Sequence, residues 1–365
     1  MRSATEGAAR RERRRSGRWV VAGLVLLAVA ACRESAETPA GPVASATRAA
    51  SIAPVDHHVH ILGPGLLADW TSLGVPFSRP DAAYLSADAL FEPKDGRPGL
   101  AAALLVPMAH LYGNDEFRAA LGLDETEERA RVARENDWVA AEARRHPGRA
   151  IAYCSVGILR PYAWDEIDRC RRELGSPGVK IHLASGGVDL RDAEQLAILE
   201  RLAAWAERER VALLVHFDPQ RRGLETEDVE RFLAEVLGPH PDLEITIAHL
   251  GGSGGYGPWT RSVFGTFQRW LSGEAAAGRP RPGVRFDVSG VLLEEESEGV
   301  PASTPEDARA LAEDLRATGL ERLVFGSDYP VFEPRRYAAV LESRLGLAPA
   351  DTEALLTARL PVMPR

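Results

Sequence analysis

Residues 54–61 read Pro-Val-Asp-His-His-Val-His-Ile, a short strand pattern that contains three histidines. Side chains two residues apart on a strand point to the same side, so His58 and His60 share one face while Val59 faces the other. Seven further short apolar segments recur along the chain, at 101–108, 149–157, 178–184, 211–217, 244–249, 284–289 and 321–326. We therefore predict a β-strand at each of these eight places.

Longer amphipathic stretches separate the predicted strands. Residues 191–208 carry Leu196, Leu199, Leu202 and Trp205 at helical spacing. Further helices are predicted at 136–146, 225–237, 260–272, 305–317, 334–345 and 349–358. Alternating strands and helices are typical of an α/β fold with a parallel sheet, and about eight such units predict a single (β/α)8 TIM-type barrel. The connection 63–100 is long for one unit and is expected to carry an inserted loop or helix.

The chain begins with a segment unlike the rest. Residues 1–31 contain seven Arg against two Glu, and an apolar run extends from Trp19 to Ala31. That run is too short for a comfortable membrane span and is typical of a signal peptide. Its end, Val29-Ala-Ala-Cys32, resembles the lipobox of bacterial lipoproteins, in which the cysteine thiol is acylated. We predict a lipoprotein signal peptide over 1–31; an ordinary signal peptide and an uncleaved anchor are the alternatives.

The segment after the predicted signal peptide has no apolar periodicity. Residues 32–53 are rich in Ala, Ser, Thr and Pro, which predicts a disordered tether from an acylated Cys32 to a barrel domain at 54–365. The protein is then exported and anchored to a membrane on its periplasmic or cell-surface side. A net charge of -9 argues against a nucleic-acid partner. Cys154 and Cys170 fall within a predicted strand and helix; we expect buried free thiols, although an oxidising compartment would allow them to pair.

Polar side chains occupy the ends of four predicted strands. His58 and His60 end the first strand, and His216, His249 and Asp328 end the fifth, sixth and eighth. One histidine at a strand end is more often a satisfied structural residue than a ligand. In a barrel, however, the carboxyl ends of all strands surround one mouth, where active sites are built. The set therefore predicts a metal or catalytic centre with a small-molecule substrate.

These segments resemble the amidohydrolase superfamily, and within it the amidohydrolase-related (amidohydrolase 2) group of metal-dependent hydrolases and decarboxylases. The resemblance rests on Asp56-His-His-Val-His60, Val215-His-Phe217, Ala248-His-Leu-Gly-Gly252 and Gly326-Ser-Asp-Tyr-Pro330, and it covers residues 54 to 330. It implies a divalent metal ion, most simply one Zn²⁺, bound by four side chains: His58, His60, His216 and Asp328.

The resemblance also implies roles in catalysis. Asp328 would exchange a proton with the metal-activated water, and His249 would hydrogen-bond that water or the developing oxyanion. Relatives with two metals carry a carbamylated lysine on the fourth strand, where Lys180 stands, and His249 is then a ligand. Lys180 and His182 are otherwise candidates for contact with the substrate. Asp56 either supports a ligand from behind or only caps a turn.

Three functions fit this set. The main prediction is a hydrolase that uses metal-activated water on a small amide, ester or lactone, because the familiar decarboxylases of the resembled group serve cytoplasmic catabolism, whereas this chain carries an export signal. The alternative is a zinc-dependent decarboxylase of a small aromatic or unsaturated acid, for which Arg160, Arg261 and Arg335 are candidate carboxylate clamps. A metal-holding binding lipoprotein without turnover is the third.

Overall fold

The computed structural model describes residues 51–75, 77, 82–218, 223–297 and 300–364. The predicted signal peptide, Cys32 and all but the last three residues of the predicted tether lie outside these residues. Ile52, from the end of that tether, packs against the main core of the domain. Across the part of the chain that is described, no helix combines the length and apolar character needed to cross a membrane.

The strands stand where the sequence predicts them, although most are shorter. They are β1 (Val55–Val59), β2 (Ala102–Leu105), β3 (Ala150–Ala152), β4 (Cys154–Ser155), β5 (Gly178–His182), β6 (Ala212–His216), β7 (Ile245–Ile247), β8 (Val284–Asp287) and β9 (Leu323–Val324). Neighbours pair in chain order, β1 to β3 in one sheet and β4 to β9 in another, and every pair is parallel. β3 and β4 are two parts of one predicted strand, separated by Tyr153.

Backbone hydrogen bonds also join the last strand to the first. The amide of His57 donates to the carbonyl of Phe325 at 2.9 Å, and the amide of Asp328 donates to the carbonyl of His58 at 2.9 Å. His60 N donates to Tyr329 O at 2.7 Å, and Val59 forms a parallel bridge with Tyr329. The segment that follows β9 thus continues the ring of strands to β1, as the predicted (β/α)8 barrel requires.

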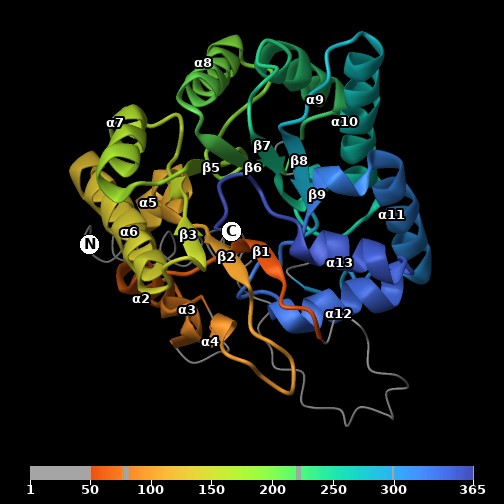
Figure 1. The fold of residues 1–365 in the computed structure, drawn as a ribbon. Coiled ribbons are helices and arrows are strands. Elements are labelled where there is room, and N and C mark those ends of the chain that lie inside the picture. The colour runs from red at the N-terminus through yellow and green to blue at the C-terminus, as the bar shows by residue number, and fades with distance from the viewer. Residues whose placement is uncertain (1–50, 76, 78–81, 219–222, 298–299, 365) are drawn as a thin grey trace, which may run out of the picture.

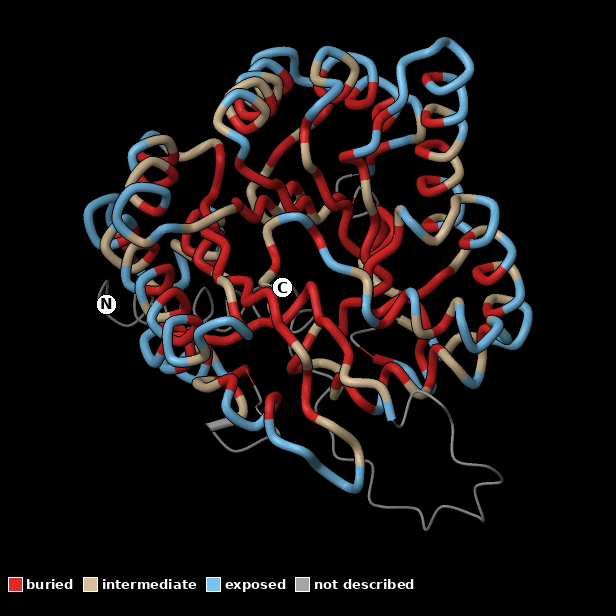
Figure 2. Tube along the Cα trace, viewed as in Figure 1, coloured by how far each residue is buried: buried red, intermediate tan, exposed pale blue. Residues whose placement is uncertain are grey.

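Helices surround the strands on the outside (Figure 1). The α-helices are α2 (Pro64–Ser72), α3 (Ala82–Leu85), α4 (Asp88–Phe91), α5 (Asp115–Leu121), α6 (Glu125–Arg145), α7 (Ala163–Arg169), α8 (Ala193–Glu209), α9 (Thr226–Phe232), α10 (Pro258–Ala276), α11 (Pro305–Thr318), α12 (Pro334–Leu345) and α13 (Pro349–Thr357). Short 3₁₀ or π turns are η2 (Ala109–Gly113), η3 (Cys170–Leu174), η5 (Leu233–Leu237), η6 (Ala248–Gly251) and η7 (Leu320–Arg322). The inward faces are buried and the outward faces exposed (Figure 2).

The predicted helices are confirmed, with one notable extension. α6 begins at Glu125, eleven residues before the predicted start, because Asp124 and Glu127 form a capping box at its N-terminus. The long connection 63–100 carries the predicted inserted structure as the three helices α2, α3 and α4.

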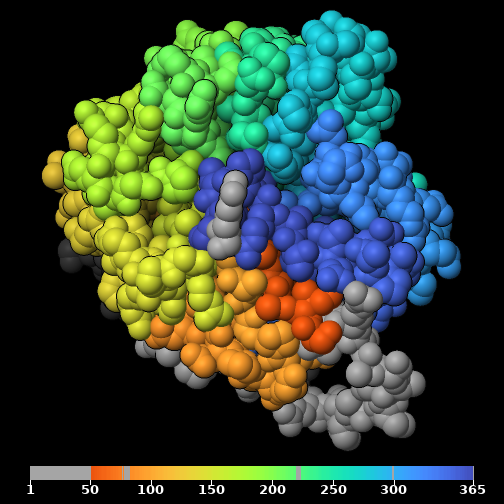
Figure 3. Space-filling view, in the orientation of Figure 1, coloured from red at the N-terminus to blue at the C-terminus, as the bar shows by residue number. Residues whose placement is uncertain are grey.

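The C-terminal segment closes the amino-terminal end of the barrel. Leu360 and Met363 are buried in a cluster with Val55 and Ala212, which lie at the starts of their strands. In the view of Figure 3, the last residues fill the middle of the face around which the helices are arranged. Access to the barrel axis is therefore left to the opposite end, where the strands finish.

The prediction of two free thiols is wrong, because Cys154 and Cys170 form a disulfide with a Cα–Cα distance of 6.0 Å. Cys154 opens β4, and Cys170 lies at the point where α7 gives way to the π turn η3. Both residues are buried. The connection from β4 returns α7 and η3 over the barrel wall, so two positions that the sequence separates into a strand and a helix come within bonding reach.

Candidate metal centre

Six of the nine histidines gather around the mouth of the barrel, and each ring contacts another of the set. Ring centroids are 4.9 Å apart for His58 and His60 and also for His58 and His249. His249 lies 4.6 Å from His216, and His216 stacks on His182 at 3.9 Å. The sixth ring, His110, lies 5.2 Å from His182.

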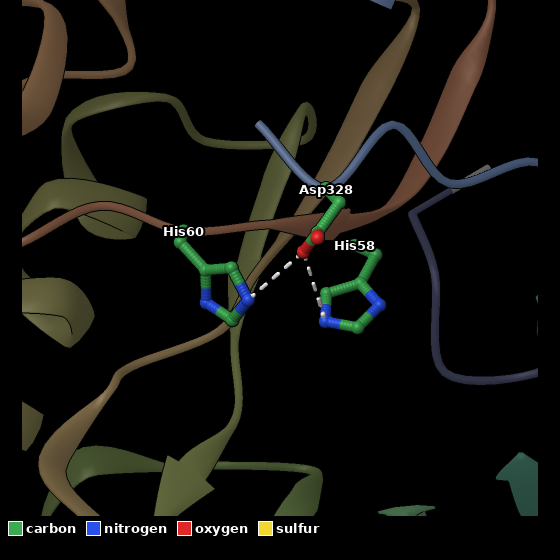
Figure 4. A group of neighbouring side chains, drawn as sticks. All are labelled: His58, His60 and Asp328. Carbon is green, nitrogen blue, oxygen red and sulfur yellow. Dashed lines mark ion pairs between the residues drawn. The ribbon is translucent and has the colours of Figure 1, made fainter. Parts of the chain in front are cut away.

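Asp328 faces His58, in β1, and His60, the residue that follows β1 (Figure 4). Its Oδ1 lies 3.2 Å from His60 Nε2 and 3.7 Å from His58 Nε2. The backbone bonds between β1 and the segment after β9 fix this position. Asp328 has a left-handed φ of 61°, which turns its side chain into the mouth. Such a conformation is costly for a residue with a Cβ and is concentrated at functional sites.

In three of these rings, the hydrogen-bond partner of Nδ1 shows which ring nitrogen carries the hydrogen. Nδ1 of His58 lies 2.9 Å from Asp287 Oδ2, Nδ1 of His60 lies 2.9 Å from the Val106 carbonyl, and Nδ1 of His249 lies 2.8 Å from the Ser289 carbonyl. An oxygen of this kind accepts, so each Nδ1 must carry the hydrogen. Each Nε2 is then a lone pair in the neutral ring, which is the form that binds a metal.

This arrangement fits a divalent ion. His60 Nε2 and Asp328 Oδ1 are two acceptors 3.2 Å apart, and a cation between them would remove their repulsion. Two atoms bound at about 2.1 Å to a tetrahedral centre lie roughly 3.4 Å from each other. The distances from Asp328 Oδ1 to His60 Nε2, 3.2 Å, and to His58 Nε2, 3.7 Å, lie on either side of that value. The ligand atoms of His58, His60 and Asp328 all lie within 4.8 Å of one another.

The charges at the site suit metal binding. Burial, together with Lys180, lowers the pKa of His58 to about 3, so this imidazole is neutral at physiological pH. Burial alone would raise the pKa of Asp328, but His249, His60 and His58 hold it well below its usual range. A neutral imidazole and an ionised carboxylate are the states that bind divalent metals.

Asp287 is the carboxylate that organises the rings. Besides His58, it accepts hydrogen bonds from the backbone amides of His249 at 2.9 Å and Ser289 at 3.1 Å. The Ser289 hydroxyl also donates to it and lies 2.9 Å from His249 Nδ1. Although Asp287 is fully buried, the His58 imidazole holds its pKa well below the usual range. A carboxylate behind a ligating histidine orients the ring and raises its basicity.

His216 belongs to the ring of histidines but not to the closest ligand group. It ends β6 and stacks on His182, which ends β5 in register with it. Of the four predicted metal ligands, the structure thus brings His58, His60 and Asp328 together, while His216 stands beside His249. His249 itself has a left-handed φ of 52°, and its ring turns toward His58.

Lys180 lies in the middle of β5 and contacts one of the histidines. It is almost completely buried, and its Nζ donates to His58 Nε2 at 3.2 Å. Burial lowers its pKa to about 8. Lys180 therefore contacts the lone pair that the predicted metal would use, in keeping with either of its predicted roles, as a metal bridge or as a substrate contact.

Asp56 supports the backbone of the site. Its Oδ1 accepts from the amides of His58 and Ser327, each at 3.0 Å, and so links β1 to the segment that carries Asp328. Burial raises its pKa to about 7. Of the two predicted roles, the backbone-capping one matches these contacts, while Asp287 is the carboxylate that orients a ligand.

The three candidate clamp arginines are engaged by protein groups, and two of them lie on helices. Arg160 donates to Glu128 at 2.7 and 2.8 Å, Arg261 in α10 donates to Asp314, and Arg335 in α12 donates to Glu333 and to the Glu92 carbonyl. These contacts do not support the prediction that the three arginines bind a substrate carboxylate.

The sequence interpretation missed Asp287, Ser289 and His110. Asp287 lies inside the predicted strand 284–289 and ends β8 only in the structure, so the strand-end rule that located the other residues did not single it out. His110 lies in η2, several residues beyond β2, where no strand-end rule applies. Only the fold brings it next to His182.

A family model described as "Amidohydrolase" matches residues 55–358. No curated protein matches the sequence. Among solved structures, 2,6-dihydroxybenzoate decarboxylase from Rhizobium is 16% identical with a TM-score of 0.54, over 83% of this chain and 96% of that one. A 5-carboxyvanillate decarboxylase from Novosphingobium aromaticivorans, complexed with manganese, is 16% identical with a TM-score of 0.53, over 86% and 98% of the two chains. A putative 2-pyrone-4,6-dicarboxylic acid hydrolase from Pseudomonas putida is 21% identical with a TM-score of 0.50, over 84% and 94%. These likenesses confirm the barrel fold.

Proposed function

The chain belongs to the amidohydrolase family, and from this premise we propose that it is a metal-dependent decarboxylase of a small aromatic acid. The observation that carries the proposal is the convergence of three side chains in ligand form, with the unprotonated Nε2 atoms of His58 and His60 beside the Asp328 carboxylate. The sequence alone favours a hydrolase, with a decarboxylase as the alternative; here the decarboxylase comes first. The solved structures with this fold include decarboxylases of aromatic acids, which supports the change.

His58, His60 and Asp328 would hold the ion, with His216 as the fourth predicted ligand. We propose Zn²⁺ or Mn²⁺, because imidazole suits the first and carboxylate the second. When bound, such an ion polarises a substrate oxygen and draws negative charge toward itself. In a decarboxylation the bond between ring carbon and carboxylate breaks, CO₂ leaves, and a proton must reach the ring carbon.

Asp328 is the residue we propose for that proton transfer. It is the more exposed partner of the group, with 22% of its side chain accessible, so a substrate can reach it. Asp328 would take a proton from an acidic hydroxyl of the substrate and deliver it to the ring carbon as CO₂ departs. His249, whose ring lies 4.9 Å from that of His58 and whose Nδ1 is taken by the Ser289 carbonyl, would hold the substrate oxygen or that proton.

Hydrolysis is the second candidate. The lowered pKa of Asp328 keeps it ionised at neutral pH, as a base for an attacking water must be. One solved structure of this fold is named a putative hydrolase of a pyrone dicarboxylic acid, which supports a lactone as the substrate class.

The two candidates differ in where solvent atoms enter the product. The metal-loaded protein would be incubated with hydroxybenzoic acids and with 2-pyrone lactones in D₂O and, separately, in H₂¹⁸O. A decarboxylase releases CO₂ and places deuterium on the ring carbon, whereas a hydrolase places ¹⁸O in the product carboxylate. Asp328→Asn should abolish either reaction, and Asp314→Asn, on the outer surface, should retain it. Turnover of neither class would overturn both candidates.

We further propose that the protein is exported and acylated at Cys32. Support comes from the charged and apolar pattern of residues 1–32 and from the disulfide within the barrel, a bond that persists in oxidising compartments. Growth with labelled palmitate should label the full chain but not Cys32→Ser. Equal labelling of both, or of neither, would contradict acylation at this residue.

A further inference from the structure

The two ends of the barrel differ in the charge of their exposed side chains. The connections that follow the strands, at the mouth, carry exposed acidic residues, among them Asp115, Glu116, Glu125 and the run 294–296. At the opposite end, where the strands begin, exposed arginines predominate. Because the whole chain has a net charge of -9, this basic end does not follow from the composition.

Five exposed arginines at that end define what we call the basic face: Arg144, Arg149, Arg210, Arg316 and Arg359. The first four lie in the segments that lead into β3, β6 and β9, and the fifth lies in the C-terminal segment that closes this end of the barrel. Figure 3 looks onto the basic face, with the C-terminal segment in its middle.

The charges of the basic face are not neutralised within the protein. In the part of the chain that is described, none of the five arginines pairs with a carboxylate. Arg149 donates to the Leu100 carbonyl at 2.6 Å, and Arg316 donates to the Gly346 carbonyl at 3.0 Å. These neutral acceptors hold the guanidinium groups in place and leave their positive charge available to a partner.

The helix dipole accounts for only part of this face. Basic residues in the last turn of a helix are stabilised by its negative end, and Arg144 and Arg316 stand in such turns. Arg149 and Arg359, however, lie beyond the ends of α6 and α13. The dipole effect falls off within the last turn, so these two arginines require another explanation.

The chain enters the barrel at this same end. Val55 opens β1, and the Pro54 carbonyl accepts from the amide of Ala101, just before β2, at 2.8 Å. In the sequence, this point follows the apolar run 19–31 and Cys32, for which we propose export and acylation. A lipid on Cys32 would therefore hold the molecule by the end that carries the basic face.

We propose that the basic face binds the anionic phospholipids of that membrane, so that the mouth of the barrel points toward the aqueous compartment. Each basic side chain near an anionic lipid surface strengthens binding several-fold. The same surface repels the acidic mouth, so both ends of the molecule favour one orientation. The inference rests on the proposed export and is independent of the proposed reaction.

The first experiment measures lipid preference with the full chain. Purified protein would be mixed with two differently dyed vesicle populations, one of phosphatidylcholine alone and one that also contains phosphatidylglycerol, and the protein on each would be measured after the vesicles are sorted. Arg144→Gln/Arg210→Gln should reduce the preference for phosphatidylglycerol about ten-fold. The control Arg134→Gln/Arg309→Gln removes the same charge from exposed positions of α6 and α11 and should retain the preference.

Any contribution of the N-terminal segment is common to these variants, so the comparison reports on the folded domain. High salt screens exposed charges and should remove the difference between wild type and Arg144→Gln/Arg210→Gln. Equal distribution of the wild type between the two membranes would overturn the inference. An equal loss in the control pair would also overturn it, because the preference would then reflect net charge and not the basic face.

The second experiment measures orientation. Cys154 and Cys170 are paired, so neither offers a thiol to a dye. Glu173→Cys, at the basic end, and Glu194→Cys, in the first turn of α8 at the mouth, each replace an exposed glutamate with a site for a fluorescent donor. Wild-type chain treated in the same way gives the background.

With an energy acceptor on the lipid headgroups of vesicles that contain phosphatidylglycerol, the donor at position 173 should transfer more energy than the donor at position 194. Equal transfer, or more from position 194, would overturn the proposed orientation. Palmitate labelling reports on acylation independently of lipid preference, so failure of the anchor and failure of the basic face are distinguishable.

Discussion

At the scale of single residues, the state of the site depends on which ring nitrogen carries a hydrogen. Asp287 decides this for His58, because its Oδ2 accepts from Nδ1. Its Oδ1 is occupied by three donors, from His249 and from the amide and hydroxyl of Ser289. The lone pair that His58 offers a metal is therefore set by a residue that does not touch the metal.

Asp287→Asn should weaken metal binding about 10- to 100-fold. The amide oxygen must face the three donors at Oδ1, so the NH₂ group faces His58 Nδ1. His58 then accepts at Nδ1 and carries its hydrogen on Nε2, where the ligand lone pair was. Competition with a chromophoric chelator would measure the affinity, with the exposed Asp165→Asn as the control. Unchanged affinity in Asp287→Asn would show that Asp287 does not set the tautomer.

The residue scale is also where sequence reasoning was most informative. The histidines and Asp328 were identified because parallel strands end at one mouth, which is a rule of the fold. The tautomers could not be predicted, since they depend on carbonyls and carboxylates from distant segments. His60 is fixed by the Val106 carbonyl, and His249 by that of Ser289.

At the scale of elements, α6 carries polar residues on its buried face. Glu128 accepts from Arg160, Glu135 from the Gly63 amide, Asn136 from the Ser155 amide, and Glu142 from the Ala87 amide. The helix predicted at 136–146 covers only the C-terminal half of α6, which has a clear apolar pattern. A buried polar face has no hydrophobic periodicity to detect, so the sequence could not show the N-terminal half.

Glu135 should make stability depend on pH. Burial raises its pKa from 4.5 to about 8, so the folded state holds a proton that the unfolded state releases. The unfolding free energy should therefore fall as pH rises from about 4.5 to 8, by at most about 5 kcal/mol. Glu135→Gln keeps an acceptor for Gly63 and should lack this fall. Urea unfolding of both proteins from pH 5 to 8 would test it, and parallel curves would contradict a buried neutral Glu135.

The disulfide joins β4 to η3 across a wall of the barrel. A bond that closes a loop of this length, with a sequence separation of 16, stabilises a fold by about 3 kcal/mol through the unfolded chain. Urea unfolding under reducing conditions should show a loss of that size. Cys154→Ala/Cys170→Ala is the control, because reductant should not change its stability further. A wild-type protein that is insensitive to reductant would mean that the two cysteines are not paired.

At the scale of the whole molecule, the eight strands could be predicted from composition and spacing because each is a short apolar run. The contact between the last strand and the first, which we call the seam, could not be predicted in this way. β9 is only Leu323–Val324, and the contact with β1 continues through irregular backbone up to Tyr329. That irregularity is also what turns Asp328 into the mouth.

A metal bound by His58, His60 and Asp328 would connect the two sides of this seam. Removing it with a chelator should lower thermal stability, because an ion present at 100 times its dissociation constant stabilises the fold by about 2.7 kcal/mol. Scanning calorimetry with and without chelator should show a lower Tm in its presence, restored by Zn²⁺ or Mn²⁺. Asp328→Asn should show little response, and a full response in that variant would place the ion elsewhere.

The number of ions and the role of His216 are decided by one further measurement. His216 lies beside His249 and not in the closest ligand group. To be a metal ligand as predicted, its ring must reach an ion held by His58, His60 and Asp328. We expect one metal per chain in the wild type, lost in His216→Ala and retained in His240→Ala, whose ring pairs with Glu200 and Glu207 outside the site. Elemental analysis of the three proteins would measure this. Two ions per chain would instead make Lys180 a bridge and His249 a ligand, while one ion retained in His216→Ala would leave His216 to contact the substrate.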